Sequence, residues 1–325
     1  MMTASRQPRK YTMQRIVFLD RDSLRANVRV PAFEHAWQDH ASTSVDDVVA
    51  RLAGATVAIT NKVPLRGDAI ARLPDLKMVA IAATGTDNVD LAACRAAGIV
   101  VANIRNYSLV SVPEHCFTLI LALRRNLRAY AADVEAGKWE TSSRFCLLDH
   151  PIGDLAGTRL GIVGYGALGR QVASIARAFG MEVVATSRSP VTDTDVTELP
   201  LDELLATSQV VSLHVPLTDA TRHMIGAREL ALMQPGALLI NTARGGLVDE
   251  AALANVLMEG RIAAGFDVLS EEPPGSNNPL LRLRLPHFLL TPHIAWASFG
   301  AMQTLADMLV DNIEAWHAGT PINVV

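Results

Sequence analysis

The sequence has few cysteines, no long apolar run and no excess of either sign of charge. The three cysteines among 325 residues, Cys94, Cys116 and Cys146, lack the spacing of metal or redox motifs, so we expect reduced thiols in a cytoplasmic protein and no metal site. No stretch approaches about 18 uninterrupted apolar residues, which argues against a membrane span. The net charge of -4 gives no electrostatic reason to expect nucleic acid or an anionic membrane as a partner.

The first 13 residues contain Arg6, Arg9 and Lys10 but no long apolar segment with a cleavage site. So short a basic segment is typical of a disordered tail rather than of a targeting sequence. We therefore expect a soluble, unsecreted protein.

Two series of short β-rich runs alternate with segments of helical length. The first contains RIVFLD, TVAIT, KMVAIAAT and GIVVANI. The second, from Leu160 to about Thr291, contains RLGIVG, EVVAT, VVSLHV, ALLINT, IAAGFDV and FLLTP. This alternation predicts an α/β protein with parallel sheets, and the length of the chain favours two domains.

One long helix is expected to connect the two series. It begins at Ser111, which has capping-box spacing to Glu114, and continues to about residue 137. Its predicted apolar face consists of Val112, Cys116, Leu119, Ile120, Leu123 and Leu127.

The expected domain organisation places one domain inside the other. Residues 111–294 would form a nucleotide-binding domain, inserted after residues 1–110 of a substrate domain. A last helical pattern lies within residues 295–325, which would return to that first domain.

Three glycines, Gly164, Gly166 and Gly169, follow an apolar strand pattern and open a helical pattern that Gly180 ends. In this context they permit a tight turn, a close approach of the backbone to a pyrophosphate and close packing of helix on strand. The helix N-terminus would offer free N–H groups to the phosphates. Glycine turns are common, but the strand before and the helix after favour dinucleotide binding.

The end of the next strand usually selects between NAD and NADP, because an acidic residue there binds the ribose hydroxyls and repels a 2′-phosphate. Ser187 and then Arg188 stand at this position. A guanidinium pairs with a phosphate and serine repels nothing, so the sequence predicts NADP as the preferred cofactor and NAD as the alternative. The other interpretation of Arg188 is a solvated loop charge.

Three polar residues follow predicted strands in the second half: Arg244, Glu272 and His293. Ligands gather at the carboxyl ends of strands in open α/β sheets, so these side chains could meet in one cleft. Arg244 would bind the carboxylate of a 2-oxo acid, and His293 would supply a proton during hydride transfer. Glu272 would hold the imidazole and keep it protonated near neutral pH. From spacing alone, all three could equally be surface or structural residues.

From Ile16 to its end, the sequence resembles the D-isomer-specific 2-hydroxyacid dehydrogenases. The matching motifs, in the order and spacing of the family, are GIVGYGALGR, SLHVPLTDATRHMI, NTARGGLVDE, GFDVLSEEP and TPHIAWAS. The resemblance implies Rossmann- and flavodoxin-like domains around a cleft, a small 2-oxo or 2-hydroxy acid as substrate, and a homodimer made largely by the nucleotide-binding domains. It also implies Arg244, Glu272 and His293 as the catalytic set.

The cofactor is expected to lie along these motifs, with Asp267 at its nicotinamide end. The cofactor-binding residues would be Gly164, Gly166, Ala167, Leu168, Gly169, Ser187, Arg188, Val215, Pro216, Thr221, Thr242, Ala243, Asp267 and Ala295. Two departures from the family pattern are Gln209 and Ser270, where acidic residues are common. The first puts in doubt how the strand that follows it is anchored.

The substrate is expected to contact both domains. The resemblance places it at the loop of Thr84, Gly85 and Thr86, whose amides could bind a carboxylate but which would otherwise be taken for an ordinary turn. Asn61 and Lys62 could border the cleft. The remaining substrate-binding residues would be Arg244, His293 and Trp296.

Trp296 is expected to shape the pocket around C3 of the substrate. Its indole would exclude branched side chains and donate a hydrogen bond to a small polar group, although it could instead pack at the domain hinge. The motifs are most similar to the glycerate dehydrogenase or hydroxypyruvate reductase branch, which implies hydroxypyruvate and glyoxylate as substrates. The alternatives are a cofactor-sensing, corepressor-like binding protein and, more weakly, formate or phosphite oxidation.

Overall fold

The structure is a computed structural model that describes residues 13–325. The tail expected before residue 13 lies outside this range. The chain divides into two compact units. Unit 1 consists of the described residues up to Tyr107 together with Ser298–Val325, and unit 2 is Ser108–Ala297.

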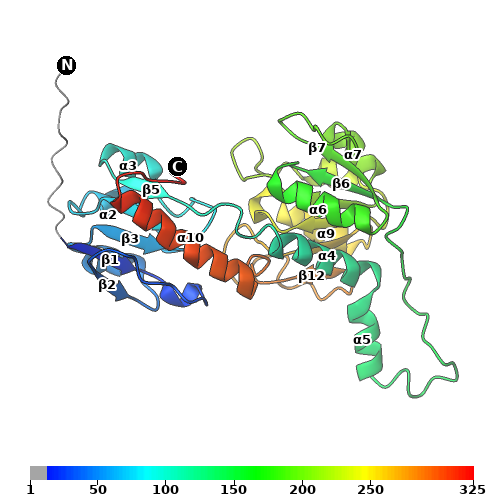
Figure 1. The fold of residues 1–325 in the computed structure, drawn as a ribbon. Coiled ribbons are helices and arrows are strands. Elements are labelled where there is room, and N and C mark those ends of the chain that lie inside the picture. The colour runs from blue at the N-terminus through cyan, green and yellow to red at the C-terminus, as the bar shows by residue number, and fades with distance from the viewer. Residues whose placement is uncertain (1–12) are drawn as a thin grey trace. The chain divides into compact units, whose positions relative to one another are not determined.

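Unit 1 is built around a five-stranded parallel sheet with the strand order β2-β1-β3-β4-β5 (Figure 1). Its strands are β1 (Gln14–Phe18), β2 (His35–Asp39), β3 (Val57–Thr60), β4 (Met78–Ile81) and β5 (Val100–Ala102). Its helices are α1 (Val48–Leu52), α2 (Gly67–Ile70), α3 (Leu91–Ala96) and α10 (Phe299–His317). β3 and β4 are buried along their whole length, because helices cover both faces of a parallel sheet.

Unit 2 contains a seven-stranded parallel sheet with the order β12-β11-β10-β9-β6-β7-β8. Its strands are β6 (Arg159–Val163), β7 (Glu182–Thr186), β8 (Thr197–Glu198), β9 (Val210–Leu213), β10 (Leu238–Asn241), β11 (Ala263–Phe266) and β12 (Phe288–Leu290). Its helices are α4 (Ser111–Arg124), α5 (Leu127–Glu135), α6 (Ala167–Ala178), α7 (Leu201–Thr207), α8 (Ala227–Leu232) and α9 (Glu250–Met258).

The two strand orders are those of doubly wound sheets, in which the chain reverses its direction of growth at one point. In unit 1 this switch point lies between β1 and β3, and in unit 2 between β6 and β9. The predicted α/β fold with two parallel sheets is therefore confirmed. No helix within residues 13–325 is both long and apolar enough to cross a bilayer.

The prediction of one long helix from Ser111 is wrong in two respects. The helix breaks after Arg124, because Asn126 adopts a left-handed backbone conformation with φ 47°, and α5 then starts a new direction. Leu127, expected on the buried face, is 62% exposed.

The predicted capping box at the start of this helix is also absent. Ser111 is the first helical residue rather than the N-cap, and its hydroxyl donates to the carbonyl of Ala295 at 2.5 Å. The hydroxyl therefore donates to a distant carbonyl instead of accepting from a backbone N–H of its own helix.

Gln209 anchors β9 in place of the acidic residue expected at its start. Its side-chain oxygen accepts from the amide of Arg159 at 2.7 Å, and its side-chain nitrogen donates to Gln234 at 3.0 Å. The neutral amide serves both neighbours because it carries an acceptor and a donor.

Candidate active site

The three glycines connect β6 to α6, as the sequence predicts. Gly164 has φ +101°, and a Cβ at this position would lie 2.6 Å from the carbonyl oxygen of His214. A Cβ at Gly169 would lie 2.4 Å from the oxygen of Gly164, so helix and loop can approach only without side chains. At Gly166, the N-cap of α6, a Cβ would have no atom within 4 Å. This open space before the helix N-terminus fits the diphosphate of a dinucleotide.

Ala167 and Leu168 form the first turn of α6, and both are half-buried. Ser187 and Arg188 directly follow β7, where they were expected. Ser187 is half-buried and Arg188 is exposed.

The segment after β9 forms the opposite side of the switch point. Burial lowers the pKa of His214 to about 4, and its Nε2 lies 2.8 Å from the Ser212 hydroxyl, so this histidine is neutral. Val215 and Pro216 follow it. The Thr221 hydroxyl donates to the carbonyl of Pro216 at 2.7 Å, which closes the turn that carries them.

A buried asparagine shapes the turn after β10. The side chain of Asn241 accepts from the amide of Ala243 at 3.1 Å and donates to the carbonyl of Arg244 at 2.9 Å. These two bonds fix the backbone of Thr242, Ala243 and Arg244. The guanidinium of Arg244 also donates to the carbonyl of Ala243 at 2.7 Å.

Glu272 and His293 are in direct contact, as predicted. One carboxylate oxygen of Glu272 is hydrogen-bonded to Nδ1 of His293, and the other accepts from the amide of Leu269 at 2.9 Å. Because Nδ1 is engaged, Nε2 is the ring nitrogen left to exchange a proton with a substrate. Glu272 follows β11, His293 follows β12, and Arg244 follows the neighbouring β10. All three residues therefore come after the carboxyl ends of adjacent parallel strands.

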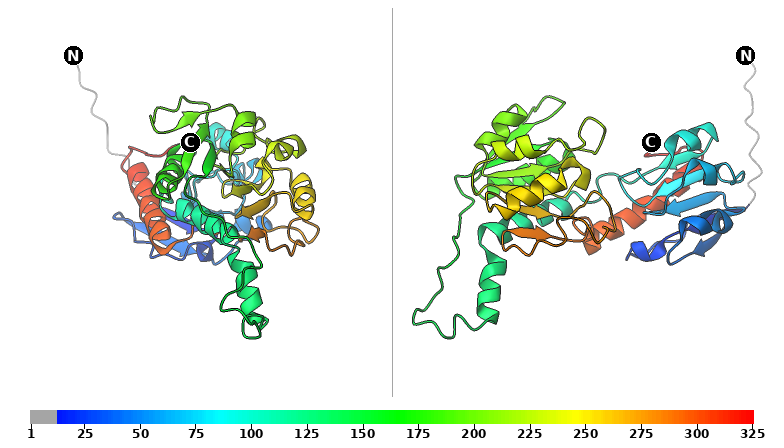
Figure 2. Two further views of the ribbon diagram at one scale, coloured as in Figure 1. Left: turned by 90° about the vertical axis from the view of Figure 1, so that its right-hand side faces the viewer. Right: turned by 180° about the vertical axis from the view of Figure 1, so that it is seen from behind.

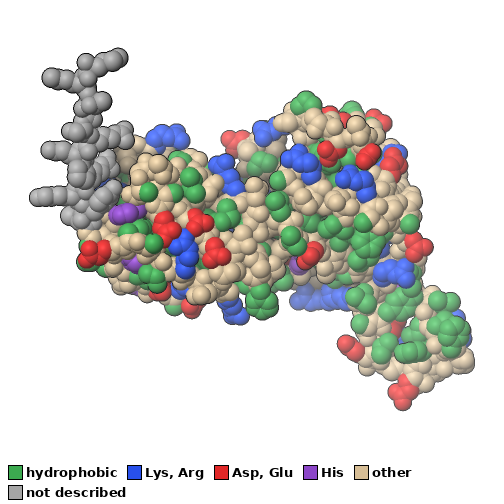
Figure 3. Space-filling model, in the orientation of Figure 1, with side chains coloured by type: hydrophobic (Ala, Val, Ile, Leu, Met, Phe, Trp, Pro, Cys, Tyr) green, Lys and Arg blue, Asp and Glu red, His purple; other side chains and the backbone are tan. Residues whose placement is uncertain are grey.

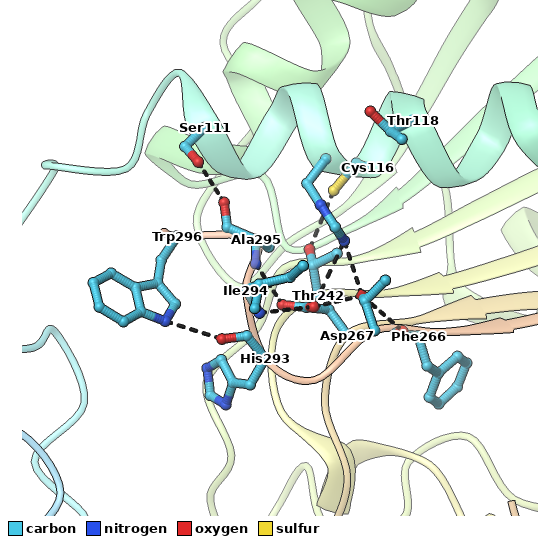
Figure 4. A network of polar contacts seen from close by, with 12 residues as sticks. Ser111, Cys116, Thr118, Thr242, Phe266, Asp267, His293, Ile294, Ala295 and Trp296 are labelled. Atoms are coloured by element: carbon cyan, nitrogen blue, oxygen red, sulfur yellow. Dashed lines mark hydrogen bonds and ion pairs between the residues drawn. The ribbon is translucent and has the colours of Figure 1, made fainter. Parts of the chain in front are cut away.

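Asp267 organises the turn that carries His293 (Figure 4). Its carboxylate accepts from the Thr291 hydroxyl at 2.5 Å, the amide of Ile294 at 2.9 Å and the amide of Ala295 at 2.7 Å. Its carbonyl accepts from the amide of His293 at 2.8 Å, which helps to hold that residue in a left-handed conformation with φ 55°. Asp267 is 1% exposed, so these donors replace water around the buried carboxylate.

His115, on α4, also joins this network and was not among the residues expected in the site. Its Nε2 lies 2.9 Å from the Thr291 hydroxyl and 3.6 Å from the carboxylate of Asp267. Because Thr291 donates to the carboxylate, its oxygen accepts from His115, so Nε2 of His115 carries a hydrogen. The next residue, Cys116, has its Sγ 3.1 Å from the hydroxyl of Thr242, and burial raises its pKa to about 11. The only sequence signal for His115 is its place in the motif SVPEHC.

Trp296 differs from the expectation in one respect. Its indole N–H donates to the carbonyl of His293 at 3.0 Å, so it is not the donor expected for a polar group of the substrate (Figure 4). The ring packs partly against the core of unit 2. The other part of the prediction, that the bulk of the indole excludes branched substrates, stays a prediction.

In unit 1 the residues Thr84, Gly85 and Thr86 follow β4. The Thr84 hydroxyl donates to the carbonyl of Ile104 at 2.7 Å, and the Thr84 carbonyl accepts from Asn103 at 2.7 Å. Both bonds hold the loop through Thr84, one through its hydroxyl and one through its carbonyl. Neither bond involves the amides of the loop, which suits a site that binds a substrate carboxylate through amides.

The switch point of unit 1 contains an aspartate, Asp20, that no sequence motif indicates. One carboxylate oxygen of Asp20 accepts from the amides of Asn61 at 3.2 Å, Lys62 at 2.7 Å and Val63 at 3.3 Å. Burial raises the pKa of Asp20, and these hydrogen bonds oppose the rise. Asn61 and Lys62, expected to border the substrate cleft, thus use their amides to bind this carboxylate.

Three comparisons with known proteins agree with this arrangement. The sequence profile described as "D-isomer specific 2-hydroxyacid dehydrogenase, NAD binding domain" matches residues 117–295. A glycerate dehydrogenase from Methylorubrum extorquens is 52% identical over 314 residues, which cover 96% of this chain and 99% of the relative. A hydroxypyruvate reductase from Blautia hydrogenotrophica is 35% identical and covers 87% of this chain and 88% of the relative.

A solved structure is also similar in fold to this chain. It is an NADPH-dependent glyoxylate/hydroxypyruvate reductase from Sinorhizobium meliloti in complex with NADP and malonate, with a TM-score of 0.83 and 28% identity. The alignment covers 97% of both chains. The chain belongs to the D-isomer-specific 2-hydroxyacid dehydrogenase family of oxidoreductases.

Proposed function

We propose that the protein reduces hydroxypyruvate and glyoxylate to D-glycerate and glycolate with NAD(P)H. The observation that carries this proposal is the contact between Glu272 and Nδ1 of His293, next to the strand end that bears Arg244. The names of the relatives, glycerate dehydrogenase and hydroxypyruvate reductase, support the same substrates.

Each catalytic residue has one role in the proposed reaction. A reduced nicotinamide cofactor, held by the glycine loop of Gly164, Gly166 and Gly169, would supply the hydride for the reduction at C2. His293 donates the proton on Nε2 to the carbonyl oxygen, while Glu272 accepts from Nδ1 and stabilises the charged ring. Arg244 binds the substrate carboxylate through two N–H groups and orients the adjacent carbonyl. The reaction consumes one proton, which solvent returns to His293.

We infer that NADPH is preferred over NADH. Ser187 places no carboxylate at the end of β7, and the exposed Arg188 follows it. A guanidinium at this place can pair with a 2′-phosphate. Ser187→Asp combined with Arg188→Ala should reverse the preference, because a carboxylate binds the ribose hydroxyls and repels the phosphate.

The substrate ranking should be hydroxypyruvate, then glyoxylate, then pyruvate well behind, with branched 2-oxo acids negligible. The indole of Trp296 supports the exclusion of branched groups by its bulk. The decisive experiment is a matrix of initial rates for these four substrates against NADPH and NADH. Faster turnover of pyruvate or of a branched acid would overturn the substrate assignment, and turnover of none would overturn the enzymatic role itself.

We also propose a homodimer that forms through an arm of unit 2, defined as α5 and residues 136–152. The arm stands away from the body of unit 2 in every view (Figures 1 and 2). Apolar side chains gather on it (Figure 3), among them Phe145, which is 90% exposed, and Leu148, which is 69% exposed. Exposed apolar surface of this kind favours contact with another protein surface.

Light scattering after size exclusion tests this proposal, since the mass should be twice 34.9 kDa. Phe145→Glu with Leu148→Glu should lower the mass to that of one chain.

We also propose a cytoplasmic location. The three cysteines are free thiols, which supports this proposal.

A further inference from the structure

The segment that carries Ser187 and Arg188 is tied to the glycine loop at both ends. At its start, the amide of Gly164 donates to the carbonyl of Thr186 at 2.9 Å. At its end, the hydroxyl of Tyr165 donates to Oδ2 of Asp193 at 2.5 Å. Two consecutive residues of the glycine loop therefore hold the two ends of one short segment.

The donor in the second tie is rigidly placed. Tyr165 is 5% exposed and packs in the core beneath α6, in the same cluster as Val172 and Val196. Burial, followed by the contact with Asp193, raises the pKa of the Tyr165 hydroxyl, while Arg177 opposes the rise. The hydroxyl therefore stays protonated and donates to the carboxylate throughout the neutral range.

The segment between the ties is short and partly exposed. Six residues, 187–192, separate Thr186 from Asp193. Within them, the amide of Val191 donates to Glu198 at 3.2 Å, and the Val191 side chain packs partly against the core. Arg188 lies on the exposed part, where the long side chain of an arginine must be ordered before it can pair with a phosphate.

We propose that Tyr165 and Asp193 form a latch that holds Arg188 in the position to recognise a 2′-phosphate, which makes Tyr165 a specificity-determining residue. Tyr165 is a positioning residue in this role, because it acts through the segment and not on the phosphate. The proposal rests on the proposed NADPH preference. It adds that the preference depends on a contact below the binding surface as well as on the residues at the strand end.

The test removes the Tyr165 hydroxyl, which contacts both Asp193 and Arg177. Tyr165→Phe keeps the buried ring and deletes only the hydroxyl. We expect KM for NADPH to rise roughly three- to tenfold, with kcat and the KM for NADH changed by less than about twofold. Asp193→Ala should match it. Asp193→Asn, which keeps an acceptor oxygen, should restore most of the discrimination.

A binding measurement separates recognition from turnover. Calorimetric titration with adenosine 2′,5′-diphosphate and with adenosine 5′-monophosphate isolates the 2′-phosphate, and Tyr165→Phe should weaken only the first ligand. The matched control is Tyr130→Phe, which deletes a hydroxyl that donates to the carbonyl of His150 at 2.6 Å in the arm. It should leave the ratio of the two affinities unchanged.

Three outcomes overturn the latch. The first is an unchanged NADPH preference in Tyr165→Phe, and the second is an equal loss for both cofactors, which would indicate general damage to the glycine loop. The third is a further loss of preference when Tyr165→Phe is added to Arg188→Ala, because the latch acts through Arg188. A wild type without NADPH preference overturns the cofactor proposal instead. In that case the latch still predicts that Tyr165→Phe weakens the binding of adenosine 2′,5′-diphosphate and of no ligand that lacks the 2′-phosphate. An unchanged affinity for adenosine 2′,5′-diphosphate would then overturn the latch as well.

Discussion

The switch points of the two doubly wound sheets differ in what they contain: a buried carboxylate in unit 1 and an open helix N-terminus in unit 2. At the switch point of unit 1, the carboxylate of Asp20 accepts hydrogen bonds from the amides of residues 61–63. At the switch point of unit 2, Gly164 and Gly166 leave the N-terminus of α6 without a side chain in front of it. Both sites gather N–H groups that attract an anion. In unit 1 this anion is a side chain of the protein itself, the carboxylate of Asp20. An internal anion stabilises a fold, whereas an open site can bind one from solution.

The largest effect should come from the catalytic histidine, which has no counterpart in the filled site of unit 1. His293→Asn should lower kcat by about 10³-fold, because the proton donor is lost. Asparagine suits the left-handed backbone of residue 293 better than alanine, which limits distortion of the turn. Steady-state kinetics give kcat, and fluorescence titration should show cofactor affinity within about threefold of the wild type. A variant that retains more than about a tenth of wild-type kcat would contradict this role.

The internal anion of unit 1 should matter for stability and not for cofactor binding. Asp20→Ala leaves three amides without their acceptor, which should lower the free energy of unfolding by about 2–4 kcal/mol. Urea denaturation measures this loss. The exposed neighbour Asp22→Ala is the matched control and should change it by less than about 0.5 kcal/mol. Weaker cofactor binding in Asp20→Ala, with stability unchanged, would break the comparison between the two sites.

Within unit 2, two glycines should separate the packing of the loop from its openness. Gly169→Ala places a Cβ against the backbone of Gly164, so we expect a loss of about 2–3 kcal/mol of stability. Gly166→Ala meets no atom within 4 Å, so its thermal midpoint should stay near that of the wild type. Its Cβ would instead enter the space before the helix N-terminus and weaken cofactor binding about tenfold or more. Normal cofactor affinity in Gly166→Ala would show that the diphosphate binds elsewhere.

The sequence predicts what depends on neighbours along the chain. The glycine loop after β6 and the polar residues after β10, β11 and β12 are local patterns in which a strand ends and a functional residue follows. Tertiary contacts decide the rest. Asp20 binds amides 41 to 43 positions away, and His115 reaches Thr291 across 176 positions. Ser111 likewise has the spacing of a cap, but its hydroxyl finds the carbonyl of Ala295, which no periodicity or propensity indicates.

The smallest expected effect concerns His214, the neutral histidine on the other side of the open switch point. Its pKa of about 4 in the folded protein lies below the value of about 6.5 expected in the unfolded chain. Above pH 6.5 neither state binds the proton, and this residue causes no pH dependence. Between pH 6.5 and 4 the unfolded chain takes up a proton that the folded protein does not, so stability falls as the pH falls.

The contribution of His214 should amount to about 1–3 kcal/mol of unfolding free energy, lost between pH 6.5 and pH 4. Carboxylates also titrate in this range, so the measurement is the difference between wild type and His214→Gln in urea denaturation at several pH values. Glutamine can still hydrogen-bond to Ser212 but takes up no proton, and its curve should be flatter by this amount. The matched control is His223→Asn. His223 is exposed, and asparagine tolerates the left-handed backbone conformation at this position. Parallel curves for wild type and His214→Gln would show that the open switch point tolerates a positive charge, and that unit 2 differs from unit 1 less than their structures indicate.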